Sequence, residues 1–270
     1  MKIILDSSIL IKDFRQIKGI TTLLLENLQS LKYSLVVPEV VIEETINKYK
    51  EELSGHSEKV LGSIKAINKL RNVFWDDSYK PHDILKLVKG YRKFLENHFK
   101  QYAVTILPIP NVAHSNLLSR DLNRRKPFSE SGKGYRDALI WYSILDYAES
   151  HNGEIAFISS NTNDFSNTEK TDWHTDLIED VKKLNNKSVT LTYYSDTASF
   201  LEKNVFPRLP KEKQILINFI KVKGDYCSLE DSLLKILEKP LLEHRVNKAD
   251  LYLRSNYENV NIVNIYAYYI

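Results

Sequence analysis

The chain has 270 residues, of which 43% are hydrophobic and 27% charged, and its formal net charge is +3. This composition is typical of a soluble globular protein with a hydrophobic core, and the length allows one large domain or one domain with a small module. The single cysteine, Cys227, excludes an internal disulfide framework and a cysteine-based zinc finger, and no apolar run approaches the roughly 18 residues needed to cross a membrane.

Short apolar runs alternate with amphipathic stretches over most of the chain. The predicted strands are 2–5, 34–38, 104–107, 155–158 and 189–194. The predicted helices are one after the second strand, which carries Val40 to Glu44, and three more over 60–70, 84–95 and 137–148. Strands that alternate with helices predict an α/β fold with a parallel sheet sandwiched by helices.

A boundary is predicted where Pro207 and Pro210 lie among charged residues. We therefore expect a first domain over residues 1–206 and a small C-terminal α+β module over 207–270, whose role the sequence does not indicate. The module is predicted to contain helices near 212–222 and 229–237 and a strand over 260–270.

Four acidic residues lie near the ends of predicted strands or the starts of predicted helices: Asp6, Glu44, Asp137 and Asp164. Taken singly, each has a structural explanation, such as a helix cap, a solvated helix acid or an Asx turn. Taken together, they would converge on one rim of the sheet, where open α/β sheets bind ligands. Several uncompensated carboxylates repel one another. A divalent ion relieves that repulsion, and oxygen ligands suit Mg²⁺ or Mn²⁺.

The segment before Asp137 is strongly basic. Residues 120–136 hold six basic and two acidic residues, a larger local excess of positive charge than the whole chain carries. Such a cluster is either a solvated face or a contact for the phosphate backbone of nucleic acid. The candidates for nucleic-acid binding are Arg124, Arg125, Lys126, Lys133 and Arg136. Tyr135 either stacks on a base or packs in the core.

The order of these motifs resembles that of PIN-domain nucleases. The matching segments are Lys2 to Ser8, Val37 to Glu44, Arg136 to Ala138, and Ser159 to Phe165, within about residues 1–200. The long stretch between the second and third motifs is similar to the insertion of a larger bacterial PIN subgroup. It includes the segments Arg124 to Phe128 and Gly132 to Asp137.

The resemblance implies roles for individual residues. The catalytic metal ligands would be Asp6, Glu44 rather than Glu43, Asp137 and Asp164. The groups that orient carboxylates or water around them would be Ser7, Ser159 and Asn161. Ser8 stands where asparagine is common in the family, and serine replaces threonine at position 159. These departures affect the surroundings of the ligands rather than the ligands themselves.

The resemblance also implies a function, a Mg²⁺- or Mn²⁺-dependent endoribonuclease that hydrolyses phosphodiester bonds in single-stranded or structured RNA. Many bacterial members are toxins paired with an antitoxin or parts of defence systems, so an antitoxin, a defence-system protein or a second copy of the chain is an expected partner. The single cysteine fits a reducing, cytoplasmic location.

Two other functions compete with this prediction. A non-catalytic RNA-binding scaffold could keep the same fold, but the presence of all four acids disfavours it. A phosphatase with an aspartate nucleophile also begins with an apolar strand and an acid. That class needs a second acid two residues later, where this chain has Ser8.

Overall fold

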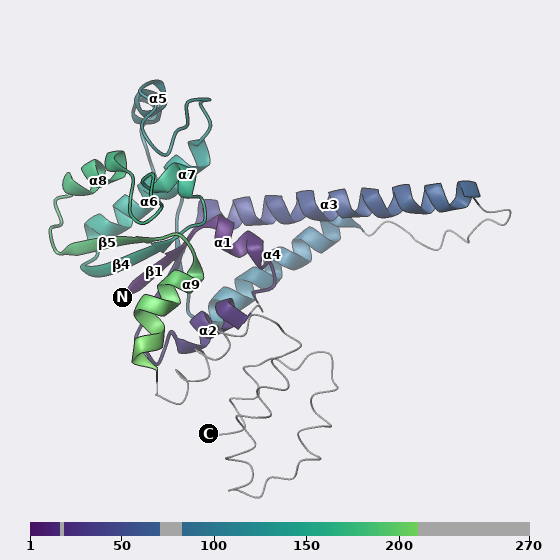
Figure 1. The fold of residues 1–270 in the computed structure, drawn as a ribbon, viewed down its shortest axis with the longest axis horizontal. Helices are drawn as coiled ribbons and strands as arrows, with labels where there is room; N and C mark the ends of the chain where they lie inside the picture. Colours follow the sequence, from purple (N-terminus) through teal and green to yellow (C-terminus); the bar gives the residue numbers. More distant parts are fainter. Residues whose placement is uncertain (17–18, 71–82, 210–270) are drawn as a thin grey trace, which may run out of the picture.

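The computed structural model describes residues 1–16, 19–70 and 83–209, which form a five-stranded sheet between helices (Figure 1). The strands are β1 (Lys2–Leu5), β2 (Ser34–Pro38), β3 (Thr105–Leu107), β4 (Gly153–Ile158) and β5 (Val189–Tyr194). Their order is β3-β2-β1-β4-β5, and every neighbouring pair is parallel. The predicted α/β class and parallel sheet are confirmed.

The order of the strands changes direction at the centre of the sheet, between β1 and β4. From β1 the chain moves outward to β2 and β3, and it then returns to place β4 on the other side of β1. In open α/β sheets, ligands bind in the crevice at such a point, outside the carboxyl ends of the strands. Asp6 and Ser159 leave β1 and β4 at this edge, and the Asp6 N–H donates to the Ile158 carbonyl at 3.0 Å.

Helices cover both faces of the sheet. Those of eight or more residues are α2 (Gly19–Asn27), α3 (Glu39–Leu70), α4 (Ile84–Gln101), α5 (His114–Leu122), α6 (Tyr135–Ser150) and α8 (Thr175–Lys182). The short ones are α1 (Ser7–Lys12), α7 (Thr162–Phe165) and α9 (Thr197–Phe200), and a π-helical turn (Leu201–Val205) and a 3₁₀ turn (Phe206–Arg208) follow. Helices α2 and α9 pack together on one side of the sheet, and α6 and α8 lie on the other (Figure 1).

Helix α3 is one continuous helix where the sequence predicted two. No proline interrupts residues 39–70, and the two glycines within it, Gly55 and Gly62, stand in open space. The first two turns of α3 are buried through apolar residues such as Val41 and Ile46. The rest projects from the sheet as an arm, with α4 packed along its nearer part (Figure 1). Glu44 therefore lies near the buried N-terminal end of a long helix.

Aromatic packing anchors the short helix α7 beneath the carboxyl edge of the sheet. Phe165 is fully buried and meets Phe157 of β4 edge-on, with ring centroids 5.0 Å apart. Phe157 in turn stacks on Trp173 at 5.6 Å. Burial of one such side chain contributes about 1.5–3 kcal/mol. This packing fixes the position of Asp164, the residue before Phe165.

The sequence did not predict α5 or α8, which are short and rich in polar residues. The division into domains over residues 1–206 and 207–270 stays a prediction, because the described residues end at Leu209. The helices and strand predicted for the C-terminal module lie outside the described residues. In the described ranges, none of the helices combines the length and the hydrophobicity that crossing a bilayer requires.

Candidate active site

Asp6 is a buried carboxylate with one satisfied oxygen and one free oxygen. It caps the N-terminus of α1, and its side chain is only 2% exposed. Its Oδ2 accepts hydrogen bonds from Ser8 N at 3.3 Å, Ser8 Oγ at 2.6 Å and Ser159 Oγ at 2.8 Å. Its Oδ1 is buried without a hydrogen-bond partner. An unpaired carboxylate oxygen inside a protein is unfavourable, so Oδ1 is the atom that an external cation would satisfy.

The environment of Asp6 has opposing effects on its protonation. Burial raises the pKa of Asp6, and the hydrogen bonds from Ser8 and Ser159 act in the opposite direction. Because these bonds all reach Oδ2, they also fix the plane of the carboxylate. The side chain is therefore held in one orientation, as the ligand of a metal needs to be.

Helix α3 directs Glu44 to the site and its neighbour Glu43 away from it. Ser7 Oγ donates to Glu44 Oε2 at 2.8 Å, and Arg136 Nη1 lies 2.9 Å from Glu44 Oε1. Glu43 instead pairs with Arg92 of α4 at 2.6 Å. Successive residues of a helix point about 100° apart, which separates the two glutamates.

Asp137 lies in the first turn of α6, where a negative charge suits the helix dipole. Burial, followed by the negative charges of Asp6, Asp164 and Glu44, raises the pKa of Asp137 to about 7. A hydrogen bond from Asn161 Nδ2 to Asp137 Oδ1, at 3.0 Å, acts in the opposite direction. The charges of acids from three other segments therefore act on Asp137.

Asp164, on α7, has a cation from the chain beside it. Lys126 Nζ lies 3.9 Å from Asp164 Oδ1 and donates to the Asn163 carbonyl at 2.7 Å. Glu44 is paired with Arg136 in the same way. Two of the four acids are thus paired with basic side chains, Lys126 from the segment before α6 and Arg136 from the first turn of α6.

The four acids do not form a closed metal cage. Within the described residues, no group of three or more His, Cys, Asp or Glu side chains is arranged so that it could hold a metal ion. The donors still fit a divalent cation, because they are all oxygens and Asp6 Oδ1 has no partner. Mg²⁺ commonly binds through one or two carboxylates and keeps waters as its other ligands.

A cleft of about 690 Å³ opens beside Asp137 and Asp164. Its walls carry three of the predicted nucleic-acid-binding residues: Lys126, Lys133 and Arg136. Tyr135 also lines the cleft and is 52% exposed, so the prediction that it packs in the core is wrong. The cleft therefore joins a basic wall to the acidic edge of the sheet.

The other predicted basic residues are occupied by ion pairs and do not line this cleft. Arg124 Nη1 lies 2.6 Å from Asp121, and Arg125 Nη2 lies 3.0 Å from Glu179 of α8. Arg120, from the same basic stretch, is only 6% exposed. The interpretation of this stretch as a solvated face is wrong for Arg120.

Two features of the site were missed from the sequence. Ser8 bonds Asp6 through its hydroxyl and also accepts from Ser160 N at 2.9 Å, so it ties the segment after β1 to the segment after β4. Helix α8 presents an acidic face to the basic stretch, formed by Asp176, Glu179 and Asp180. Acids three and four residues apart lie on one helix face, and that spacing was a usable signal.

Comparison with known proteins identifies the family. A family model described as the PIN domain matches residues 3–165, which is more than half of the chain and contains all four acids. No curated protein and no solved structure gives a significant match. PIN domains are generally divalent-metal-dependent nucleases. The match begins in β1 and ends at Phe165, so it spans the reversal point of the sheet and its acidic edge, and the chain belongs to the PIN-domain family.

Proposed function

We propose that the chain is a divalent-metal-dependent nuclease that hydrolyses phosphodiester bonds in RNA. The observation that carries the proposal is the setting of Asp137, where burial and then the negative charges of Asp6, Asp164 and Glu44 raise the pKa of Asp137 to about 7. Perturbed carboxylates next to a cleft are typical of catalytic sites. The free Oδ1 of Asp6 adds a ligand atom that no group in the described residues satisfies.

In this proposal Asp6, Glu44, Asp137 and Asp164 together form the site for Mg²⁺ or Mn²⁺. Such an ion activates water and neutralises negative charge on a phosphodiester. Ser7, Ser159 and Asn161 orient the acids, since each donates a hydrogen bond to a different one of them: Glu44, Asp6 and Asp137. Groups of this kind hold a ligand in place and tune its basicity.

The cleft beside Asp137 would receive the nucleic acid. Lys126, Lys133 and Arg136 would contact phosphates, and the exposed ring of Tyr135 would stack on a base. Arg124 and Arg125 would act from the rim, since both are held in ion pairs. Phosphate contacts fix the position of the strand without reading its sequence.

A cleavage assay with matched variants tests this proposal. The full chain is incubated with Mn²⁺ and labelled single-stranded RNA, hairpin RNA or single-stranded DNA. Asp6→Asn, Asp137→Asn and Glu44→Gln should each lower cleavage by about 100-fold or more, because loss of an acid of the metal site costs at least as much as loss of a group that orients one. Glu43→Gln should cleave normally, since Glu43 pairs with Arg92.

Two outcomes would count against the proposal. If the wild type cuts none of the three substrates better than an Asp6→Asn/Asp137→Asn double variant, the chain is a binding scaffold. If only DNA is cut, the nuclease assignment stands and the RNA assignment fails.

The biological setting that best suits this activity is a bacterial toxin or defence effector in the cytoplasm. Such a nuclease needs a partner that restrains it, either an antitoxin or another protein of the defence system. We assign residues 1–206 to the nuclease domain and residues 207–270 to a separate small module, which would carry contacts to a partner or to a second copy of the chain. Co-purification of the full chain and of residues 1–206 with the product of a neighbouring gene would test the division.

A further inference from the structure

The four acids fall into two classes according to what neutralises them. Glu44 Oε1 lies 2.9 Å from Arg136 Nη1, and Asp164 Oδ1 lies 3.9 Å from Lys126 Nζ. In the described part of the chain, neither Asp6 nor Asp137 forms an ion pair with Lys, Arg or His. Glu44 and Asp164 therefore each have a cation of the chain beside them, and Asp6 and Asp137 do not.

Lys126 is held at the site through its backbone as well as its side chain. Its N–H donates to Asp176 Oδ2 at 2.8 Å, and its carbonyl accepts from Arg120 Nε at 2.7 Å. Its Nζ donates to the Asn163 carbonyl at 2.7 Å. Because both backbone groups are bound, the ammonium is presented to Asp164 by a fixed segment.

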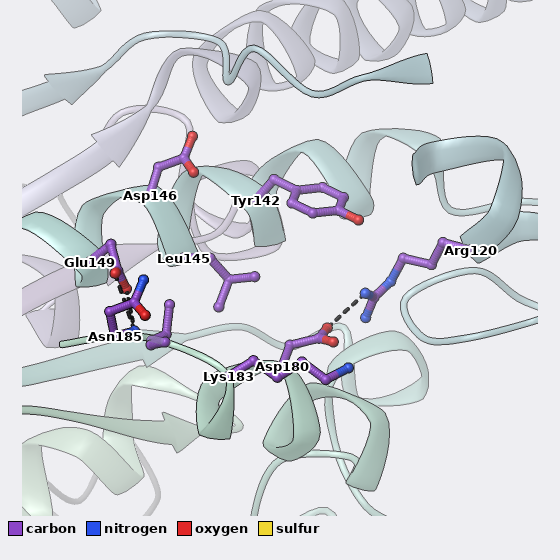
Figure 2. A pocket seen from close by; sticks show the side chains of 9 residues that line it. Arg120, Tyr142, Leu145, Asp146, Glu149, Asp180, Lys183 and Asn185 are labelled. Carbon is purple, nitrogen blue, oxygen red and sulfur yellow. Dashed lines mark hydrogen bonds and ion pairs between the residues drawn. The ribbon is translucent and has the colours of Figure 1, made fainter. Parts of the chain in front are cut away.

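A buried ion pair between Arg120 and Asp180 holds the segment that carries Lys126. Arg120 Nη1 lies 2.7 Å from Asp180 Oδ2 of α8, as Figure 2 shows beside the ring of Tyr142. The buried Trp141 donates from Nε1 to the same carboxylate at 3.0 Å. Arg125 adds a second bridge to α8, 3.5 Å from Asp180 Oδ1. Buried charges that are paired and hydrogen-bonded in this way hold a single geometry.

An ammonium group and a second divalent ion would compete for the same acid. Two-metal sites hold their ions about 3.5–4 Å apart, and both ions share the surrounding carboxylates. A fixed positive charge beside Asp164 repels a dication that approaches that acid. Arg136 has the same effect at Glu44, whose other oxygen is occupied by the Ser7 hydroxyl. Asp6 Oδ1, which is buried without a hydrogen-bond partner, belongs to one of the two acids that lack a neighbouring cation.

We propose that this chain binds one divalent ion, held by Asp6 and Asp137, and that Lys126 and Arg136 supply the positive charge that a second ion would bring to Asp164 and Glu44. The inference rests on the proposed nuclease function. Both cations also line the cleft, so the same charges face a bound phosphate.

The number of bound ions tests this inference without a cleavage assay. Metal-free full-length chain is titrated with Mn²⁺, with isothermal calorimetry for the stoichiometry and electron paramagnetic resonance for the free ion. The wild type should bind one Mn²⁺. A Lys126→Met/Arg136→Met double variant should bind two, with the second site at least tenfold tighter than any second site of the wild type.

A matched control tests whether the effect belongs to Lys126 and Arg136 or to any positive charge in the cleft. Lys133→Met removes a positive side chain from the same cleft, and within the described residues Lys133 forms no ion pair with the four acids. This variant should still bind one ion. The supporting segment should survive Lys126→Met because Asp176 and Arg120 bind its backbone, and circular dichroism with thermal unfolding checks the fold.

Three results would overturn the inference, and they differ in what else they overturn. Two ions of similar affinity in the wild type would exclude a one-ion site and leave the nuclease proposal intact. One ion in the double variant would exclude the role of Lys126 and Arg136. No Mn²⁺ binding by the folded wild type would remove the proposed function together with the inference.

Discussion

Asn161 Nδ2 donates to Asp137 Oδ1 at 3.0 Å, so the segment after β4 restrains an acid in the first turn of α6. Asp137 is the acid on which the charges of Asp6, Asp164 and Glu44 act. The contact therefore joins the two elements at Asp137. The negative charge of this acid suits a metal ligand but destabilises the metal-free fold, so the two requirements conflict.

That conflict predicts a pH-dependent gain in stability for Asp137→Asn. The pKa of Asp137 rises from 3.8 to about 7 on folding, so the native state holds the proton more tightly than the unfolded chain. The ionised acid then destabilises the metal-free protein above about pH 7, and this cost falls as the pH is lowered toward 4. Asp137→Asn should raise the free energy of unfolding by up to roughly 4 kcal/mol near pH 8, at about 1.4 kcal/mol for each tenfold change in proton affinity.

Urea unfolding in a chelator at several pH values measures this effect. The difference between variant and wild type should fall by more than half between about pH 8 and pH 5. A difference that stays constant over this range would show that Asp137 does not titrate there.

Ser159→Ala should weaken metal binding through its effect on Asp6. The substitution removes one of the hydrogen bonds that orient the carboxylate, and loss of such a group lowers metal affinity by about 10–100-fold. Ser143→Ala is the matched control, because Ser143 is also buried but donates to the Leu139 carbonyl within α6. Mn²⁺ calorimetry on both variants should show the loss only for Ser159→Ala. Equal affinities would remove Ser159 from the site.

Gly134→Ala should displace the basic wall of the cleft. Gly134 has φ +127°, and an added Cβ would lie 2.5 Å from the Pro127 carbonyl oxygen. We expect a loss of about 2–4 kcal/mol in stability and weaker binding of single-stranded RNA. Gly90→Ala, in the open middle of α4, should instead stabilise the chain by about 0.5–1 kcal/mol. Thermal unfolding and fluorescence anisotropy measure the two effects, and similar results for both variants would contradict the steric argument.

Asp180→Asn should be strongly destabilising. It leaves the buried guanidinium of Arg120 without its closest carboxylate, and such losses cost about 3–5 kcal/mol. Glu179→Gln, on the same helix, removes a largely exposed acid and should cost less than about 1 kcal/mol. Chemical unfolding of the two variants compares them directly. A small effect for Asp180→Asn would mean that the Arg120 ion pair does not hold the segment.

The strands were predictable because a parallel sheet buries both of its faces. Strands such as 34–38 are continuous apolar runs with sharp ends, and the structure reproduces those limits. The length of α3 was not predictable from local propensity. The two apolar stretches at 40–44 and 60–70 predicted two helices, yet the glycine between them, Gly55, costs a helix only about 1 kcal/mol relative to alanine.

The sequence indicated the four acids as a set but not the cations that pair with them. The order of the motifs indicated Asp6, Glu44, Asp137 and Asp164, whose roles stay predictions, and the charges of the other three act on Asp137. The pairing of Lys126 with Asp164 and of Arg136 with Glu44 joins segments far apart in the sequence. No spacing rule describes such contacts, because they depend on how α8 and α6 place the basic stretch.

The length of α3 makes Glu44 sensitive to events far from the sheet. At about 1.5 Å per residue, Glu44 lies roughly 8 Å from the start of the helix and Leu70 roughly 47 Å from it. A rigid tilt of α3 about its first residue, Glu39, would therefore act as a lever with a ratio of about six. A deflection of about 6 Å at the tip would move Glu44 by about 1 Å. A displacement of that size is large enough to disturb the alignment of catalytic groups with a substrate. A force applied to the tip of α3 would thus change the position of Glu44 at the acidic edge of the sheet.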